Sequence, residues 1–336
     1  MRAVVFHGQR DLELVNVPDP TPAPDEVVVA IAASGMCGSD LHTFRGPRRD
    51  PAVIGGHEPA GVIAEVGAGV PRHWIGRRVF VHHYFGCGRC DQCRAGWAQM
   101  CREGATAMGN TAPGSHAEYV CVPFRTVVEM PDELSFLAAA ADGCGTGTAW
   151  GGLKRLGLAG DDTIAVFGQG PVGLAATQFA SAMGARVIAL DISESRLERS
   201  RDFGAWATIN PGAVDIIADA VKELNGGRGV SASLETSGAS SAASEALNVL
   251  DLWGRACWVG VGSTVSFAVT DHLYKQVTGM TSWTTSINGL EDCTRFVVER
   301  GIDVDSLFTD RWELGQCAEA YELFDQQTSG KAAFIL

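Results

Sequence analysis

The chain has 336 residues, enough for two domains of ordinary size. Of these residues 46% are apolar and 19% are charged, as in proteins with a well-packed core. The net charge of −13 argues against nucleic acid or an anionic membrane surface as a partner, because both attract Lys and Arg. The N-terminal residues lack the apolar stretch of a secretory signal, and no apolar run reaches the ~18 residues of a membrane span. A cytoplasmic protein is therefore expected.

Short strands dominate the chain as far as Pro131. Their apolar segments are separated by glycine-containing turns, and the proline-rich run 18–24 excludes helix and interior strand. This pattern predicts an antiparallel, barrel-like domain. The predicted strands are Met1–Phe6, Leu12–Val17, Val27–Ala33, Val62–Val66, Arg78–His82, Ala117–Pro123 and Thr126–Met130.

After Pro131 the pattern changes to alternating strands and helices, which predicts an open parallel sheet with helices on both faces. The predicted helices are Leu134–Ala141, Thr148–Leu156, Val172–Met183, Glu194–Phe203, Asp215–Leu224, Ser240–Leu250, Leu290–Arg300 and Gln316–Gln326. The predicted strands are Thr163–Phe167, Arg186–Leu190, Ala207–Ile209, Val230–Leu234, Ala256–Val259, one near Val277–Trp283, and Ala332–Leu336.

A glycine-rich loop of the pattern G-x-G-x-x-G follows the first strand of the alternating region and opens a helix, which is the context that dinucleotide binding requires. The first glycine makes the tight turn, the second lets a pyrophosphate approach the backbone, and the third lets the helix pack on the strand. The helix N-terminus then faces the phosphates. The residues of this cofactor loop are Gly168, Gly170, Pro171, Val172 and Gly173.

The next strand of this region ends in Asp191. A carboxylate here accepts hydrogen bonds from the adenosine ribose hydroxyls and repels a 2′-phosphate, so NAD is favoured over NADP. The alternative for Asp191 is a charge at the N-terminus of the following helix, ahead of Glu194. Arg196 lies near enough to touch the ribose, although a solvated helix face explains it nearly as well.

His57 and Glu58 stand side by side in a glycine-rich turn before a predicted strand. Imidazole is a common zinc ligand, although an isolated pair of this kind would be explained by a hydrogen bond at the strand start. Cys37 lies twenty residues upstream, in the segment that continues to His42. The combination predicts a metal held at this turn.

Ten cysteines are many for a protein of a reducing compartment, where disulfides are rare and clustered cysteines indicate metal. Four of them lie in the lobe 86–102 with the spacing C-x2-C-x2-C-x7-C. Four thiolates complete a tetrahedral zinc site without an open position, so its role would be structural. Disulfides and an iron–sulfur cluster are the alternatives. The proposed ligands are Cys87, Cys90, Cys93 and Cys101.

These motifs, in this order, resemble those of the zinc-containing medium-chain alcohol and polyol dehydrogenases over essentially the whole chain. The resemblance implies an α/β fold with a GroES-like, β-barrel-type catalytic domain and a Rossmann domain with a doubly wound parallel sheet. The catalytic domain would comprise residues 1–147 and 284–336, and the NAD-binding domain residues 148–283. The active site would lie in the cleft between them.

The resemblance also implies two zinc ions per chain, one structural and one catalytic. Cys37 and His57 would be ligands of the catalytic zinc, and Cys144 the third, because it stands four residues before a threonine as in the ethanol-type branch. Glu58 would support the site from outside or exchange as a ligand, and Asp142 is a weaker candidate for the third place. Three protein ligands leave an open position at which zinc polarises a substrate oxygen.

The family's proton relay implies that Ser39 takes the alcohol proton and passes it through the ribose hydroxyls to His42, unless His42 is a surface helix residue. Asp40 would orient a zinc ligand. Lys331 matches a position where a basic residue approaches the pyrophosphate, with a solvated lysine as the alternative. Val261 is also predicted to contact the cofactor.

Two histidines replace residues that are apolar in many members of the family. His83 stands where ethanol-type enzymes carry a large apolar residue, and His116 where phenylalanine is frequent. They predict a polar substrate pocket, with two satisfied strand histidines as the alternative, and Phe44 and Trp283 would add apolar walls. Gly38 follows the first cysteine ligand, as in the polyol and threonine-type branch.

We therefore predict a zinc-dependent oxidoreductase that transfers a hydride between NAD(H) and a secondary alcohol or ketone, of the polyol, sugar or cyclitol class. A dehydrogenase of a simple or amino alcohol is the alternative. A non-catalytic member of the fold and a zinc-free quinone reductase are disfavoured, because the ligand and relay residues are all present. The family suggests a homodimer or homotetramer.

Overall fold

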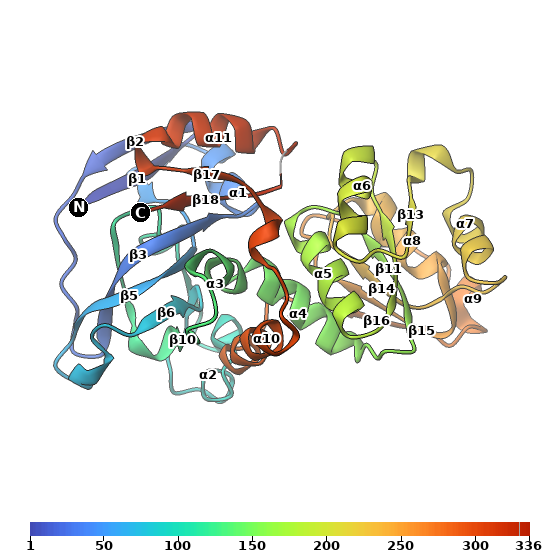
Figure 1. Ribbon diagram of the computed structural model, residues 1–336, viewed down its shortest axis with the longest axis horizontal. Helices are drawn as coiled ribbons and strands as arrows, with labels where there is room; N and C mark the ends of the chain where they lie inside the picture. Colours follow the sequence, from blue (N-terminus) through green and yellow to red (C-terminus); the bar gives the residue numbers. More distant parts are fainter. Residues whose placement is uncertain (329) are drawn as a thin grey trace. The chain divides into compact units, whose positions relative to one another are not determined.

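The computed structural model describes residues 1–328 and 330–336. The chain divides into two compact units. Unit 1 comprises Met1–Cys144 and Ser286–Leu336, so segments from both halves of the sequence build it, and unit 2 comprises Gly145–Thr285 (Figure 1). The domain boundaries predicted from the sequence lie at 147/148 and 283/284.

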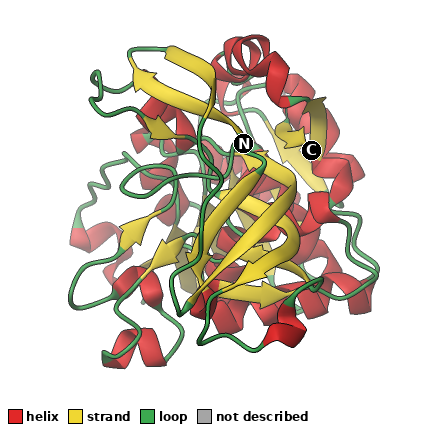
Figure 2. Cartoon of the chain, turned by 90° about the vertical axis from the view of Figure 1, so that its left-hand side faces the viewer, coloured by secondary structure: helices red, strands yellow, loops and turns green. Residues whose placement is uncertain are grey.

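The principal sheet of unit 1 has the strand order β10-β6-β5-β3-β18-β17, and it is strongly curved (Figure 2). One edge of β3 pairs with β9 in its first half and with β18 in its second, while the other edge pairs with β5. These pairings are antiparallel, whereas β17 and β18 run parallel. The strands are β3 (Glu26–Met36), β5 (Glu58–Val66), β6 (Arg78–Val81), β9 (Tyr119–Pro123), β10 (Val127–Glu129), β17 (Phe308–Trp312) and β18 (Lys331–Ile335).

The core of this sheet follows the period of two that strands impose on their side chains. Val27, Val29 and Ile31 point to one side of β3 and pack against Ile63 of β5 and Val79 of β6. Alternate residues of a strand point to the same face of the sheet. The alternating apolar residues in the sequence therefore indicate which face is buried.

A second core of unit 1 lies beneath helix α11 (Cys317–Asp325). Phe6 of β1, Phe44 of α1, Tyr321 of α11 and Phe334 of β18 pack together there. The other elements of unit 1 are β1 (Arg2–Gly8), β2 (Asp11–Asn16), α1 (Asp40–Arg45), β4 (Val53–Ile54), β7 (Tyr84–Phe85), α2 (Asp91–Arg94), β8 (Thr106–Ala107), α3 (Phe136–Asp142) and α10 (Ile287–Arg300).

Unit 2 is a parallel six-stranded sheet with the order β13-β12-β11-β14-β15-β16. The order reverses at β11, so the cofactor loop after β11 lies at the point where ligands bind in sheets of this kind. Its strands are β11 (Thr163–Phe167), β12 (Arg186–Leu190), β13 (Ala207–Ile209), β14 (Val230–Glu235), β15 (Leu250–Trp258) and β16 (Thr278–Thr281). Its helices are α4 (Gly145–Leu156), α5 (Pro171–Ala182), α6 (Glu194–Asp202), α7 (Ile217–Leu224), α8 (Ser240–Asn248) and α9 (Val269–Leu273).

The predicted combination of a curved, mostly antiparallel sheet and an open parallel sheet is confirmed. Several elements differ from the prediction. Glu58 begins β5 rather than lying in the turn, and β15 begins at Leu250. The elements β17 and α9 were not predicted, nor were the short elements β4, β7, β8 and α2. Among the described residues no helix combines the length and the apolarity needed to cross a membrane.

Candidate active site

Four side chains of unit 1 converge on a point that could hold a metal ion. Cys37 follows β3, His57 precedes β5, Glu58 begins β5 and Cys144 follows α3. One ligand atom from each lies within 4.8 Å of the others, and the sulfurs of Cys37 and Cys144 are 3.9 Å apart. The structure thus brings together the residues that the sequence predicts for the catalytic zinc. Asp142 is not a member of this group and is within hydrogen-bonding distance of the Thr294 hydroxyl instead.

Asp40 at the start of α1 fixes two members of the group. Its Oδ1 lies 2.7 Å from His57 Nδ1, and its Oδ2 accepts a hydrogen bond from the backbone N–H of Cys37. A carboxylate can only accept, so His57 carries its proton on Nδ1 and presents the lone pair of Nε2 to the metal position. Burial opposes a charge on His57, but the charge of Asp40 and its hydrogen bond leave the His57 pKa well above its ordinary value.

The two cysteine thiols of the group differ in how readily they ionise. A hydrogen bond from the Cys144 thiol lowers the pKa of Cys37 well below its usual value, against the effect of burial, and His57 adds to the shift. The same contact, together with burial, raises the pKa of Cys144. The group therefore already favours a thiolate at Cys37, which is the form that binds a metal.

Glu58 forms a buried ion pair with Lys331. The Lys331 Nζ lies 2.5 Å from Glu58 Oε2, and the two side chains are 2% and 0% exposed. Burial raises the pKa of Glu58 to about 7, and the ammonium of Lys331 opposes that rise. The sequence predicts Lys331 at the cofactor pyrophosphate. In the structure β18 pairs with β3, and this places Lys331 beside Glu58 at the metal group instead.

The two residues of the predicted relay differ in their surroundings. The hydroxyl of Ser39 donates to Cys37 Sγ at 3.3 Å and lies 3.2 Å from His57 Nε2, so it is close to the metal position. His42 lies on the exposed side of α1. Within residues 1–328 and 330–336 the His42 imidazole makes no hydrogen bond with Ser39.

His83 lies next to the metal group. Its ring centroid is 4.9 Å from that of His57, and its Nδ1 lies 2.9 Å from the carbonyl oxygen of Gly143. A carbonyl only accepts, so Nδ1 carries the proton and Nε2 is an acceptor. Burial, followed by the charge of His57, keeps the pKa of His83 well below its ordinary value. His83 is thus a neutral acceptor beside the metal position.

The structure buries the side chains of His116 and Phe44 in unit 1. His116 is fully buried, with Nδ1 at 2.8 Å from Ser34 Oγ and Nε2 at 2.7 Å from the Tyr321 hydroxyl. Phe44 packs on Phe6 and Tyr321. The His116 ring lies against Gly56, where a Cβ would be 2.3 Å from Nδ1, so it supports the turn next to His57. Sequence spacing alone did not distinguish this role from lining a pocket. Trp283 is half exposed and belongs to unit 2.

The burial of His116 predicts an acid-sensitive fold. Burial lowers the pKa of His116 from 6.5 to about 4, so the unfolded chain binds more protons between these values and stability is lost as the pH falls through that window. The loss from this group is about 3 kcal/mol. Replacing His116 with phenylalanine removes two hydrogen bonds, so we expect lower stability at pH 7 but a smaller decrease from pH 7 to pH 4.5. Thermal unfolding across this range measures it.

The exposed His73 provides the matched control for this experiment. A His73→Phe variant should keep the pH dependence of the wild-type chain. An unchanged slope in the His116→Phe variant would show that the buried imidazole does not titrate in this way.

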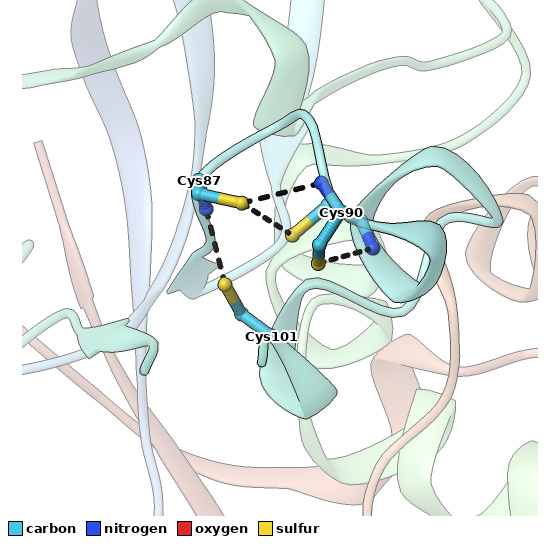
Figure 3. Close-up of side chains that lie close together, drawn as sticks. Cys87, Cys90 and Cys101 are labelled. Carbon is cyan, nitrogen blue, oxygen red and sulfur yellow. Dashed lines mark hydrogen bonds between the residues drawn. The ribbon is translucent and has the colours of Figure 1, made fainter. Parts of the chain in front are cut away.

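The four-cysteine lobe forms a second candidate metal centre (Figure 3). Cys87, Cys90, Cys93 and Cys101 each place a sulfur within 4.8 Å of the others. Backbone N–H groups point at these sulfurs: Cys90 N donates to Cys87 Sγ and Cys93 N donates to Cys90 Sγ. Hydrogen bonds from the backbone of Cys93 and Arg102 lower the pKa of Cys90 to about 6, which favours the thiolate. Four sulfur donors without a further group suit a closed, structural zinc site.

Replacing Cys101 with serine should remove the zinc of this lobe. We expect zinc content to fall from two to one per chain and the unfolding midpoint to fall by about 5 °C or more, because a domain of 150–250 residues loses about 2–4 °C per kcal/mol. Elemental analysis and thermal unfolding measure both quantities. An Arg94→Ser variant, altered at an exposed position of the same lobe, should retain two zinc ions. Retention of both ions by the Cys101 variant would contradict the assignment.

In unit 2 the three glycines of the cofactor loop meet three different constraints. Gly168 has a φ of 86°, a left-handed conformation that favours glycine. A Cβ on Gly173 would lie 1.8 Å from the carbonyl oxygen of Gly168, so helix α5 can approach the loop only without a side chain there. Around Gly170 no heavy atom of the described chain lies within 4 Å of a Cβ position, which leaves room for a phosphate group. Helix α5 then begins at Pro171.

Asp191 closes the other side of the cofactor loop. Its Oδ2 accepts from the backbone N–H of Gln169 at 2.6 Å, and its Oδ1 accepts from Ser193 N–H. The guanidinium Nη1 of Arg196 lies 3.9 Å from Asp191 Oδ2. The two side chains predicted to contact the ribose are therefore neighbours. Val261, after β15, is 78% exposed, and its carbonyl oxygen packs against Gly238.

Comparisons with known proteins agree with this geometry. The alcohol dehydrogenase GroES-like domain matches residues 23–132, and the zinc-binding dehydrogenase domain matches residues 171–299. An uncharacterised zinc-type alcohol dehydrogenase-like protein of Escherichia coli K12 is 33% identical, covering 98% of this chain and 97% of that protein. The chain belongs to the zinc-containing medium-chain alcohol dehydrogenase family.

Further relatives cover the whole dehydrogenase. A sorbitol dehydrogenase of Bacillus subtilis is 31% identical over 96% of this chain and 93% of that protein. The solved structure of an alcohol dehydrogenase from Thermus sp. ATN1 has a TM-score of 0.93 at 28% identity, covering 100% of this chain and 99% of that one. The predicted fold and the predicted enzyme class, a zinc-type NAD-dependent alcohol dehydrogenase, are confirmed.

The donor atoms of this dehydrogenase fit the metal that its family name states. Four sulfurs suit a structural zinc, whereas two sulfurs, one imidazole nitrogen and a nearby carboxylate suit a catalytic one. Sequence reasoning missed the partnership of Glu58 and Lys331. The only signal for it is a lysine that opens an otherwise apolar strand.

Proposed function

We propose that this dehydrogenase oxidises the secondary hydroxyl of a polyol or sugar-like substrate with NAD, and reduces the corresponding ketone with NADH. The observation that carries the substrate class is His83. Its fixed tautomer leaves Nε2 as an acceptor beside the metal group, where a second substrate hydroxyl would find a partner. Relatives include the sorbitol dehydrogenase and an L-threonine 3-dehydrogenase of Rhizobium etli, 29% identical, so the substrates within this family are diverse.

In this proposal Cys37, His57 and Cys144 hold the catalytic zinc. When bound, zinc polarises the substrate oxygen and makes its hydroxyl more acidic. Asp40 keeps the Nε2 lone pair of His57 directed at the metal position through its bond to Nδ1. Ser39 would accept the substrate proton at Oγ and release its own hydroxyl proton. Because Ser39 and His42 share no side-chain hydrogen bond in the described chain, the ribose hydroxyls of bound NAD would have to connect them, and the exposed imidazole of His42 would release the proton to water.

We propose NAD rather than NADP as the cofactor, held by the loop at Gly168–Gly173 and the carboxylate of Asp191. The Asp191 oxygens are already directed at this loop, and a negative charge there disfavours a 2′-phosphate. A relative from E. coli CFT073, 25% identical, was solved with NADH, whereas one from Sinorhizobium meliloti, 26% identical, was solved with NADP. Arg196, Val261 and the loop residues Pro171 and Val172 would complete the contacts.

A panel assay tests the proposal. NAD reduction is followed with polyols, sugars, cyclitols, amino alcohols and simple alcohols, and each active substrate is repeated with NADP. We expect the highest kcat/KM for substrates with a hydroxyl next to the reacting one, and a His83→Phe variant should lose that preference while retaining simple secondary alcohols. Equal activity with mono-alcohols and polyols would overturn the proposed substrate class. A preference for NADP would overturn the proposed cofactor.

We also propose that the chain forms a homodimer or homotetramer. Strand β16 is the edge of its sheet and is largely exposed, so its backbone groups are available to a second copy. Leu252, Trp253, Leu273 and Tyr274 are exposed apolar residues of the same unit. Sedimentation of the wild-type chain and of a Thr281→Pro variant tests this. The backbone N–H of Ser282 bonds to Trp258 of β15, so the N–H of Thr281 faces the free edge of β16, and proline removes it. A monomeric wild type would refute the proposal.

A further inference from the structure

The buried ion pair of Glu58 and Lys331 lies directly behind the candidate metal group. Both side chains are almost inaccessible to solvent, and their charged atoms are 2.5 Å apart. The Nζ of Lys331 also lies 3.4 Å from the carbonyl oxygen of Met36 and above the ring of Phe308. Removing two charges from water costs several kcal/mol for each ion, so a pair in this position requires close contact to persist.

The pair crosses the central strand of the sheet. Glu58 lies opposite Gly35 in the pairing of β5 with β3, and Ala332, which follows Lys331, lies opposite Met36 on the other edge of β3. A Cβ on Gly35 would lie 2.1 Å from Glu58 Oε2. The carboxylate therefore occupies the space of the missing side chain, and this is how it reaches the lysine on the far side of β3.

The same carboxylate is a member of the metal group. One ligand atom of Glu58 lies within 4.8 Å of the ligand atoms of Cys37, His57 and Cys144, while its Oε2 contacts Lys331. A buried carboxylate needs a positive partner. If the lysine is absent, the nearest cation available to it is the metal ion itself.

We propose that Lys331 is a positioning residue that holds Glu58 away from the catalytic metal and so leaves coordination to Cys37, His57 and Cys144. This inference rests on the ligand set of the proposed function. Lys331 touches neither the substrate nor the cofactor and acts only through the carboxylate. Without it, Glu58 takes the position that the substrate oxygen needs.

The two possible roles of Lys331 predict opposite effects on metal retention. Loss of a purely structural partner weakens metal binding, typically by about 10–100-fold. The proposed role adds a ligand when the lysine is removed, so a Lys331→Met variant should lose catalytic-site metal to a chelator about tenfold more slowly than the wild type, because one more carboxylate neutralises the bound ion. Its kcat should fall at the same time.

The experiment replaces the catalytic zinc with Co²⁺ and records visible spectra and the rate of metal loss to a chelator. Lys331→Met should change the cobalt spectrum towards a higher coordination number. The double variant Glu58→Gln/Lys331→Met should return to the wild-type spectrum, because it lacks the carboxylate. Lys331→Arg should resemble the wild type, and Lys222→Met, at an exposed position of unit 2, controls for charge loss.

Three outcomes overturn the inference: faster metal loss from Lys331→Met, an unchanged cobalt spectrum, or a spectral change that persists in the double variant. If Lys331→Met does not fold, Lys331→Gln takes its place, because it keeps a hydrogen-bond donor for Glu58 but not the charge. Faster metal loss or an unchanged cobalt spectrum in that variant overturns the inference equally. Failure of the wild-type chain to bind Co²⁺ at Cys37 would instead refute the proposed function itself.

Discussion

Replacing Cys37 with serine should abolish alcohol oxidation while leaving the fold intact. We expect zinc to fall from two ions per chain to one, and kcat/KM to fall by about 10³-fold or more, because a Lewis acid supplies several kcal/mol of transition-state stabilisation and each 1.36 kcal/mol is a factor of ten. The remaining zinc should be that of the four-cysteine lobe. Elemental analysis and NAD reduction with the best substrate of the panel provide both measurements.

Cys121 provides the control for this variant. It is a half-buried cysteine of β9 whose thiol donates to Glu26, outside both metal groups. Cys121→Ser should retain two zinc ions and near wild-type activity. A Cys37→Ser variant with two zinc ions and full activity would show that the buried group is not the catalytic centre.

Replacing Gly173 with alanine should disrupt the cofactor loop. The added Cβ would lie 1.8 Å from the carbonyl oxygen of Gly168, which is backbone and cannot rotate away, so the loop or helix α5 must move. We expect a loss of about 1–3 kcal/mol in stability, as for other overpacked sites. NAD affinity should fall at least about tenfold, equivalent to about 1.4 kcal/mol of binding free energy.

Gly170→Ala is the matched comparison, since its Cβ would meet no heavy atom of the described chain within 4 Å. This variant should unfold at the wild-type temperature but still bind NAD more weakly, because its methyl group occupies the space of the pyrophosphate. Thermal unfolding without cofactor and fluorescence titration with NAD separate the two effects. Equal stability of the two variants would contradict the packing explanation for Gly173.

Local spacing in the sequence is enough to predict which side chains lie together when they belong to one short segment. The four cysteines of the lobe and the glycines of the cofactor loop lie within short segments, so the motif and the geometry coincide. Cys37, His57 and Cys144 are distant from one another, but each stands in a motif of its own. The resemblance to the family supplied the connection that spacing alone does not provide.

Lys331 shows what local spacing cannot supply. Its partner is decided by the pairing of β18 with β3 and of β3 with β5, which no short segment of sequence specifies. Likewise His116 and Phe44 were predicted to line the substrate pocket, but their side chains point into the core beneath α11. Glu58 was expected in a turn because Pro59 and Gly61 follow it, although strands at bulges and close backbone approaches accept both residues.

The chain order of the strands also bears on when the metal site can be completed during synthesis. Unit 2 lies between the two segments of unit 1, and β18 is made only after the whole of unit 2. Domains generally fold as units while the chain is still growing, so unit 2 can fold before Lys331 has been synthesised. During that time Glu58 lacks its positive partner, although Cys37 and His57 are already present. The site therefore acquires its final charge balance last, and we expect selective zinc loading to follow release of the chain from the ribosome.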